Sequence, residues 1–160
     1  MCAGAIFAYL GEREFVSDDG CLDPIAGVAN IPENHHVHGK IVYASLVCTF
    51  RHGREEDETC GLKFAKEMVL DRAQIWPNNN SKGEPNKLQL KLMQKLGDNA
   101  RHFILNFPTN SPNSVAIVGE PGDRVEMGVS YEIRLHIADR PDDFKGNKKA
   151  TVAMSVNKVH

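Results

Sequence analysis

The sequence lacks the marks of several common protein classes. Its 160 residues carry 19 lysines and arginines against 21 aspartates and glutamates, and this balance argues against a protein that coats nucleic acid. No stretch approaches the ~18 uninterrupted apolar residues of a membrane span. The opening MCAGAIFAYL has no basic residue before its apolar run, which disfavours a signal peptide. These absences leave a soluble globular chain of one domain's length.

Catalytic and cofactor-binding motifs are missing as well. The sequence has no GxSxG, no Walker loop and no CxxC pair, so no nucleophile or phosphate cradle is marked. Its four cysteines are Cys2, Cys21, Cys48 and Cys60. Cys48 lies in an apolar stretch, where free cysteine behaves as a small buried hydrophobe. We therefore expect reduced cysteines, a cytoplasmic location, no enzymatic activity and no cofactor.

One histidine-rich tract offers a metal-binding alternative. ENHHVH (33–38) contains Glu33, His35, His36 and His38, and such tracts bind zinc or copper in other proteins. The spacing is not HExxH, and no distant Cys/His pair completes a ligand set. The prediction is that there is no metal site, with metal binding at this tract as the rival hypothesis.

Alternation with a period of two residues dominates the chain. The clearest case is VSYEIRLHIA (129–138), where every odd-numbered residue from Val129 to Ile137 is apolar and the residues between them are polar. Further strands are predicted at 6–11, 27–31, 41–50, 62–70, 102–107, 114–118 and 151–159. Turn-rich segments separate them. Eight or nine such strands predict an all-β fold, an immunoglobulin-like antiparallel β-sandwich.

A single segment has helical periodicity. NKLQLKLMQKLGDN (86–99) places Leu88, Leu92 and Leu96 four residues apart, beside lysines at 87, 91 and 95. Gly97 is the expected C-cap. The sequence therefore predicts one short amphipathic α-helix whose leucine stripe packs on the core.

A charged stretch joins two of the predicted strands. FRHGREEDETCGLKF (50–64) contains two arginines and four consecutive acids, with no helical or strand periodicity. The connection is about ten to twelve residues long, whereas hairpin loops usually have two to five. Loops of this length tend to be functional or disordered.

The same stretch closely resembles the F-R-Y-G-R-E-D-x-D-x-x-G-L-x-F segment of the arrestins, which forms the mobile receptor-binding finger loop of that family. Further matches follow in order along the chain: YLGEREFV (9–16), DPIAGV (23–28), KLQLKLMQKLG (87–97), FPTNSPNSV (107–115), GVSYEIR (128–134) and NKKATVAMSVNKV (147–159). The resemblance covers residues 6–160. It implies one arrestin N-terminal domain of the invertebrate visual, or phosrestin, type.

The resemblance also implies functional residues. The finger loop would comprise Arg51, Arg54, Glu55, Glu56, Asp57, Glu58, Thr59, Cys60 and Gly61. Receptor phosphates would meet Arg13, Lys95, Lys148 and Lys149, and the helix would pack through Leu88, Leu92 and Leu96. The alternative interpretation is a solvated loop and ordinary surface cations.

Three positions depart from the family pattern. Glu12 stands where a lysine is usual, Glu14 replaces the aspartate of the buried polar core, and Asn157 occupies the place of its arginine. The family's first strand, with its V-F-K-K motif, and its second domain find no match. We expect a form that is truncated at both ends, has impaired phosphate sensing and leaves helix leucines exposed.

The implied function is that of a non-enzymatic adaptor. Family members bind activated, phosphorylated G-protein-coupled receptors, terminate G-protein signalling and promote internalisation. The expected partner is such a receptor, with rhodopsin as one candidate, and further family partners are phosphoinositides or inositol phosphates and endocytic proteins. The chain would be cytoplasmic and reach the plasma membrane only through its receptor. The alternative is an arrestin-like endocytic or retromer cargo adaptor, against which the finger-loop match argues.

Overall fold

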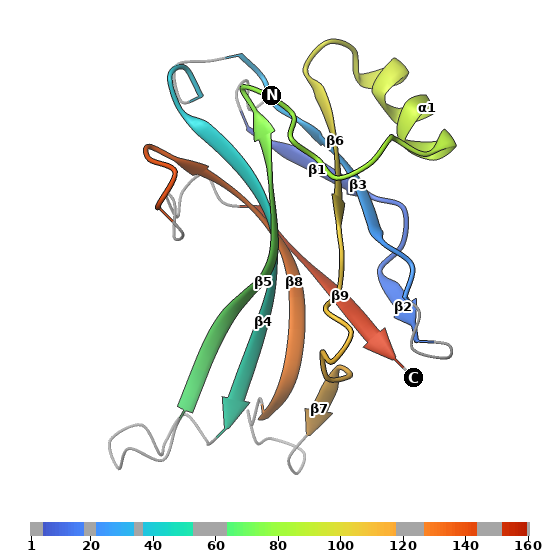
Figure 1. Ribbon diagram of the computed structural model, residues 1–160, viewed down its shortest axis with the longest axis vertical. Coiled ribbons are helices and arrows are strands. Elements are labelled where there is room, and N and C mark those ends of the chain that lie inside the picture. The colour runs from blue at the N-terminus through green and yellow to red at the C-terminus, as the bar shows by residue number, and fades with distance from the viewer. Residues whose placement is uncertain are drawn as a thin grey trace.

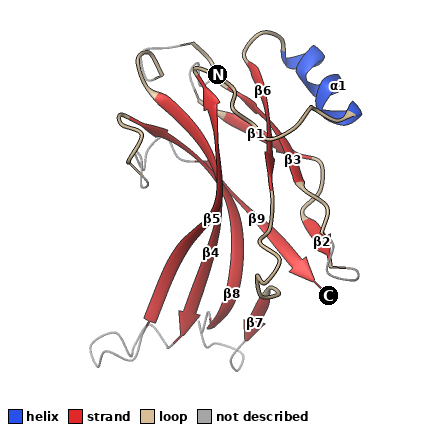
Figure 2. Cartoon of the chain, viewed as in Figure 1, coloured by secondary structure: helices blue, strands red, loops and turns tan. Residues whose placement is uncertain are grey.

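The computed structural model describes residues 5–17, 22–33, 37–52, 64–117, 127–143 and 152–159. Nine strands and one helix lie in these ranges, as Figures 1 and 2 show. They are β1 (Phe7–Leu10), β2 (Glu14–Val16), β3 (Ile25–Asn30), β4 (Ile41–His52), β5 (Phe64–Trp76), α1 (Lys87–Leu96), β6 (Ala100–Leu105), β7 (Val115–Ile117), β8 (Met127–Ala138) and β9 (Val152–Val159). No helix in the described ranges has the length and apolarity needed to cross a membrane.

The strands form two sheets. One has the order β1-β3-β6, and the other has the order β2-β9-β8-β4-β5 with β7 also pairing with β8. Pairing is antiparallel except between β2 and β9, which run parallel. In Figure 1, β4, β5 and β8 extend well beyond the three-stranded sheet. The predicted β-sandwich with one short helix is confirmed.

Apolar residues from both sheets meet in one core. Tyr131, Ile133 and Leu135 of β8 pack with Ile25 of β3 and Phe103 of β6, and all five are at most 2% exposed. The predicted apolar face of 129–138 is therefore confirmed. The opposite face of β8 was expected to be solvated, yet His136 on that face is 1% exposed.

β4 and β5 form one long hairpin whose pairing runs from Val42 opposite Trp76 to His52 opposite Phe64. β5 continues six residues beyond the predicted strand end at 70. The continuation is stabilised because Ala73 and Ile75 are buried in the core.

Helix α1 begins at a capping box. The side chain of Asn86 accepts from the Gln89 backbone N–H at 2.8 Å, and the Gln89 side chain accepts from the Asn86 N–H at 2.9 Å. The helix ends at Gly97, whose φ is 80°, as predicted for a glycine C-cap.

The buried face of α1 differs from the prediction. Gln89 is 2% exposed, whereas Leu88 is 49% exposed, and Leu92 and Leu96 are half-buried. The Gln89 amide donates to the carbonyl oxygens of Gly27 at 2.9 Å and Phe103 at 3.1 Å. Leu88 therefore does not pack on the core, which agrees with the alternative expectation of exposed helix leucines, and the helix is anchored instead through a polar side chain to backbone carbonyls of β3 and β6.

Candidate functional site

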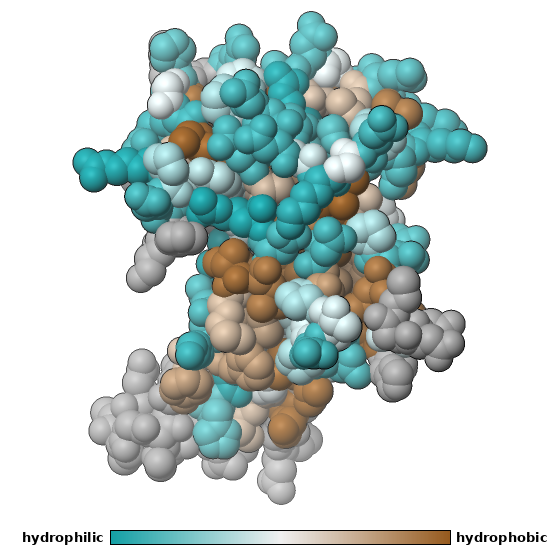
Figure 3. Space-filling view, viewed as in Figure 1, coloured by the Kyte–Doolittle hydropathy of each residue, from teal (hydrophilic) through white to brown (hydrophobic). Residues whose placement is uncertain are grey.

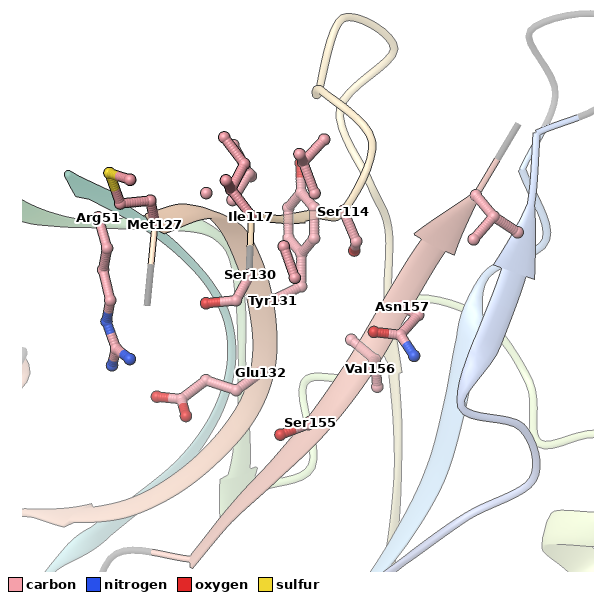
Figure 4. Close-up of a pocket in the computed structure, with 15 residues that line it drawn as sticks. Arg51, Ser114, Ile117, Met127, Ser130, Tyr131, Glu132, Ser155, Val156 and Asn157 are labelled. Carbon is pink, nitrogen blue, oxygen red and sulfur yellow. The ribbon is translucent and has the colours of Figure 1, made fainter. Parts of the chain in front are cut away.

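A cavity of about 580 Å³ opens beside the end of the six-stranded sheet. Its walls are Arg51, Ser114, Val115, Ala116, Ile117, Met127, Gly128, Val129, Ser130, Tyr131, Glu132, Ser155, Val156, Asn157 and Val159. Figure 4 shows Ser155 and Asn157 on β9 across an open gap from Ser130 and Glu132 on β8.

The cavity exists because β9 leaves β8. The two strands pair from Leu135 opposite Val152 to Tyr131 opposite Val156. Beyond this point β9 pairs with β2 instead, whereas β8 pairs with β7. β9 therefore diverges from the β7–β8 pair, and the cavity lies in the wedge between β7 and β9.

Polar groups line the wedge beside the apolar residues of β7. The charged ones are Arg51 at the end of β4 and Glu132 on β8. Glu132 is bound by Arg134, which also donates to Glu67 at 3.1 and 3.2 Å. Hydrogen bonds raise the pKa of Arg134, and the bond to Glu67 contributes more than the bond to Glu132. Hydroxyls, one amide and a compensated acid make the cavity suited to hydrogen-bonded recognition.

The structure describes one of the nine predicted finger-loop residues. Arg51 is exposed and lies between Ala65 of β5 and Gly128 of β8 in the sheet. The other eight lie outside the described residues: Arg54, Glu55, Glu56, Asp57, Glu58, Thr59, Cys60 and Gly61. The start of the charged connection is thus placed at the cavity.

Glu14 and Asn157, the two positions predicted to replace polar-core residues, lie opposite each other in the β2–β9 pair. Both are exposed, and the backbone N–H of Asn157 donates to the carbonyl of Arg13 at 2.7 Å. An acid here faces a neutral amide, so this pair of positions carries no ion pair.

The predicted phosphate-binding residues do not form one described site. Arg13 is exposed just before β2, and Lys95 is exposed in the last turn of α1. No described contact joins them, and Lys148 and Lys149 lie outside the described residues.

The third departure, Glu12, lines a second cavity of about 380 Å³ beside α1. Asp23 and Glu84 also line it, together with the half-exposed Leu88. Three carboxylates in its walls make this cavity unsuited to an anionic ligand such as a phosphate.

The histidine tract is described only in part. Glu33 and His38 are exposed, whereas His35 and His36 lie outside the described residues. In the described part of the chain, no group of three or more His, Cys, Asp or Glu side chains is placed to hold a metal ion.

A buried cation next to the cavity was not predicted from the sequence. Lys158 is 4% exposed, and its ammonium donates to the Ser111 carbonyl and, at 3.1 Å, to the Ser111 hydroxyl. The Tyr131 hydroxyl donates to the Pro112 carbonyl in the same segment, and burial raises its pKa far above the ordinary value. The burial of Lys158 could have been predicted from the alternation along 151–159, which places this residue on the inward face.

The burial of a second polar residue, His136, was not predicted either. The ring lies 5.6 Å from that of Tyr43, over which the Arg72 guanidinium stacks at 3.9 Å. Neither ring nitrogen has a hydrogen-bond partner in the described part of the structure. Burial, followed by the charge of Arg72, lowers the pKa of His136.

Comparison with known proteins gives a consistent result. Residues 7–160 match the family model described as "Arrestin (or S-antigen), N-terminal domain". Phosrestin-1 of Calliphora vicina is 40% identical over 157 residues, which cover 98% of this chain and 39% of that protein. An arrestin homolog of Locusta migratoria is also 40% identical, over 98% of this chain and 38% of its own length.

A solved structure agrees with these relatives. The crystal structure of squid arrestin superposes with a TM-score of 0.78 at 30% identity, covering 98% of this chain and 50% of that one. The chain spans about two-fifths of the length of the curated relatives it matches.

Proposed function

Because the chain belongs to the arrestin family, we propose that it is a non-enzymatic adaptor that binds activated, phosphorylated G-protein-coupled receptors, terminates their G-protein signalling and promotes their internalisation. Residues 6–160 act as one arrestin N-terminal domain. Rhodopsin is one candidate receptor, given the phosrestin relatives. The protein works in the cytoplasm and reaches the plasma membrane through the receptor, with phosphoinositides or inositol phosphates and endocytic proteins as further partners.

One observation carries this proposal. The finger-loop match begins at the end of β4 and ends at the start of β5, which are two of the three strands that extend beyond the three-stranded sheet (Figure 1). The two strand ends that the connection joins are held away from the β1-β3-β6 layer, because β4 and β5 pair along their length. Arg51 lies at its start and in the cavity wall. This is a suitable position for a loop that enters a receptor.

The test is an exchange of residues 55–60 for a Gly/Ser linker. We expect wild-type protein to be recovered several-fold better by active receptor than by inactive receptor, and the linker form to lose that preference. The linker form should keep its fold, because the flanking strands keep their core packing. The matched control replaces the exposed loop residues Asn78 and Asn80, which line neither cavity, with Gly and Ser. A linker form that keeps the preference for active receptor would contradict the role of the loop.

Phosphate sensing in this chain is proposed to be weak. A guanidinium held among carboxylates can be pulled away by an incoming phosphate, but Asn157, opposite Glu14, has no charge to be pulled. Glu12 adds a second acid close by in the sequence.

The corresponding variant is Asn157→Arg, with Ser155→Arg on the same face of β9 as its control. We expect Asn157→Arg to strengthen binding of a phosphorylated receptor-tail peptide about threefold to tenfold at low salt, with a gain that shrinks as salt is raised. Isothermal titration at two salt concentrations measures this. An equal gain in Ser155→Arg would show that the effect depends on net charge and not on position 157.

A further inference from the structure

Lys158 occupies an inward-facing position of β9. Its neighbours on that face, Val156 and Met154, belong to or pack on the apolar core, whereas Asn157 and Ser155 face outward and line the cavity. Moving an ammonium ion into such surroundings is strongly unfavourable before its contacts are counted. An apolar side chain would be the simpler occupant, so the contacts of Lys158 call for an explanation.

All described contacts of this ammonium go to one residue. The amine donates to the Ser111 carbonyl and hydroxyl oxygens, and no carboxylate of the described residues pairs with it. The Ser111 hydroxyl in turn donates to the Pro108 carbonyl at 2.8 Å. The charge is therefore stabilised by a folded turn of the segment 108–114 and not by an ion pair.

The backbone of Lys158 binds the same segment a second time. Its N–H donates to the Ser114 hydroxyl at 2.9 Å, and its carbonyl accepts from the Ser114 N–H at 2.7 Å. Tyr131 of β8 holds the segment from the other side through the Pro112 carbonyl. β7 begins at Val115, directly after this anchored segment.

We propose that Lys158 is a positioning residue: its buried ammonium and backbone fasten the segment 108–114 to β9, and this attachment sets the separation of β7 from β9 across the cavity. Adjacent residues of β9 then act on the two sides of the wedge. Asn157 forms part of one wall, and Lys158 fixes the segment that leads into the other. Any displacement of β9 at Asn157 is transmitted to β7 through Lys158. The link to receptor binding rests on the proposed function, whereas the positioning itself does not.

The experiment compares Lys158→Met with Lys158→Arg. Methionine fills the space on an apolar face without the ammonium, and arginine keeps donors for Ser111. We expect amide hydrogen exchange at Ser111, Ser114 and Val115 to become about tenfold faster in Lys158→Met and to change less than about threefold in Lys158→Arg. Melting temperatures should stay within about 3 °C of wild type, because loss of the hydrogen bonds is offset by removal of a buried charge. Lys91→Met, on the exposed face of α1, is the matched control.

A second variant covers the case in which Lys158→Met does not fold. Ser111→Ala removes one acceptor from a half-buried surface residue, and we expect exchange at Ser114 to become about twofold to threefold faster. Unchanged exchange at Ser114 in every folded variant would overturn the positioning role.

Recovery on active receptor provides the functional measurement. We expect Lys158→Met to lose at least threefold in recovery at a temperature well below its melting point, and Lys158→Arg to retain most of it. Faster exchange with unchanged recovery would overturn the link between this residue and receptor binding. If wild-type protein itself shows no receptor binding, the proposed function fails, and the exchange data still decide the positioning role.

Discussion

His136 and Lys158 are polar side chains at positions where alternation along a strand gives opposite predictions. Lys158 falls on the inward face of β9, and His136 falls on the outward face of β8, yet both are at most 4% exposed. His136 is buried because Tyr43 packs against it and the Arg72 guanidinium, stacked on Tyr43, donates to the Pro141 carbonyl at 2.9 Å, bringing the turn after β8 close. Arg72 and Arg134 disfavour a proton on the imidazole, and Asp143 favours one.

His136 should make the stability of the fold depend on pH. The pKa of His136 is lowered in the folded protein. At pH values between the ordinary pKa near 6.5 and the folded pKa, the unfolded chain therefore binds more protons than the folded chain does. The free energy of unfolding should therefore decrease as pH falls below about 7, with a slope of up to ~1.4 kcal/mol per pH unit from this group. Chemical denaturation at pH 7.5 and pH 5.5 measures the loss.

Two histidine variants isolate this effect. His136→Gln should reduce the loss of stability between the two pH values, whereas His38→Gln, at an exposed position, should leave it unchanged. Identical pH dependence in wild type and His136→Gln would show that other groups cause it.

Among the helices and strands, those with the strongest sequence periodicity were predicted correctly. β8 and α1 were predicted within two residues of their ends, because alternation, a glycine C-cap and helical spacing are local properties. The parallel pairing of β2 with β9 was not predicted, since it joins residues about 140 positions apart and β2 has three residues. The burial of Gln89 was not predicted either, because its acceptors lie on β3 and β6.

The Gln89 side chain should contribute to stability because it anchors α1. Gln89→Ala leaves the carbonyls of Gly27 and Phe103 without their described donor and removes half of the capping box. It should lower the free energy of unfolding by about 1–3 kcal/mol. Gln94→Ala, at an exposed position of the same helix, should change it by less than about 0.5 kcal/mol. Urea denaturation of the three proteins measures both, and equal small effects would mean that the helix is held by Leu92 and Leu96 instead.

At the scale of the whole molecule, the two sheets overlap only in part. Figure 3 shows apolar side chains gathered in the lower half of the visible face, where β4, β5 and β8 extend beyond the three-stranded sheet. Phe64 and Ile117 are each more than half exposed in this part of the molecule. The start of the charged connection, the wedge between β7 and β9, and this apolar surface therefore lie at the same end of the molecule. We infer that this end meets the receptor, and that the opposite end, with α1, stabilises the fold.

The proposed function requires that the chain distinguish an activated receptor from an inactive one. Its most direct test is a binding titration of the purified 160-residue protein against one light- or agonist-activated receptor and the same receptor held inactive, both in lipid nanodiscs. We expect the dissociation constant for the active form to be at least about tenfold lower, a difference of ~1.4 kcal/mol. Equal dissociation constants for the two forms would contradict it.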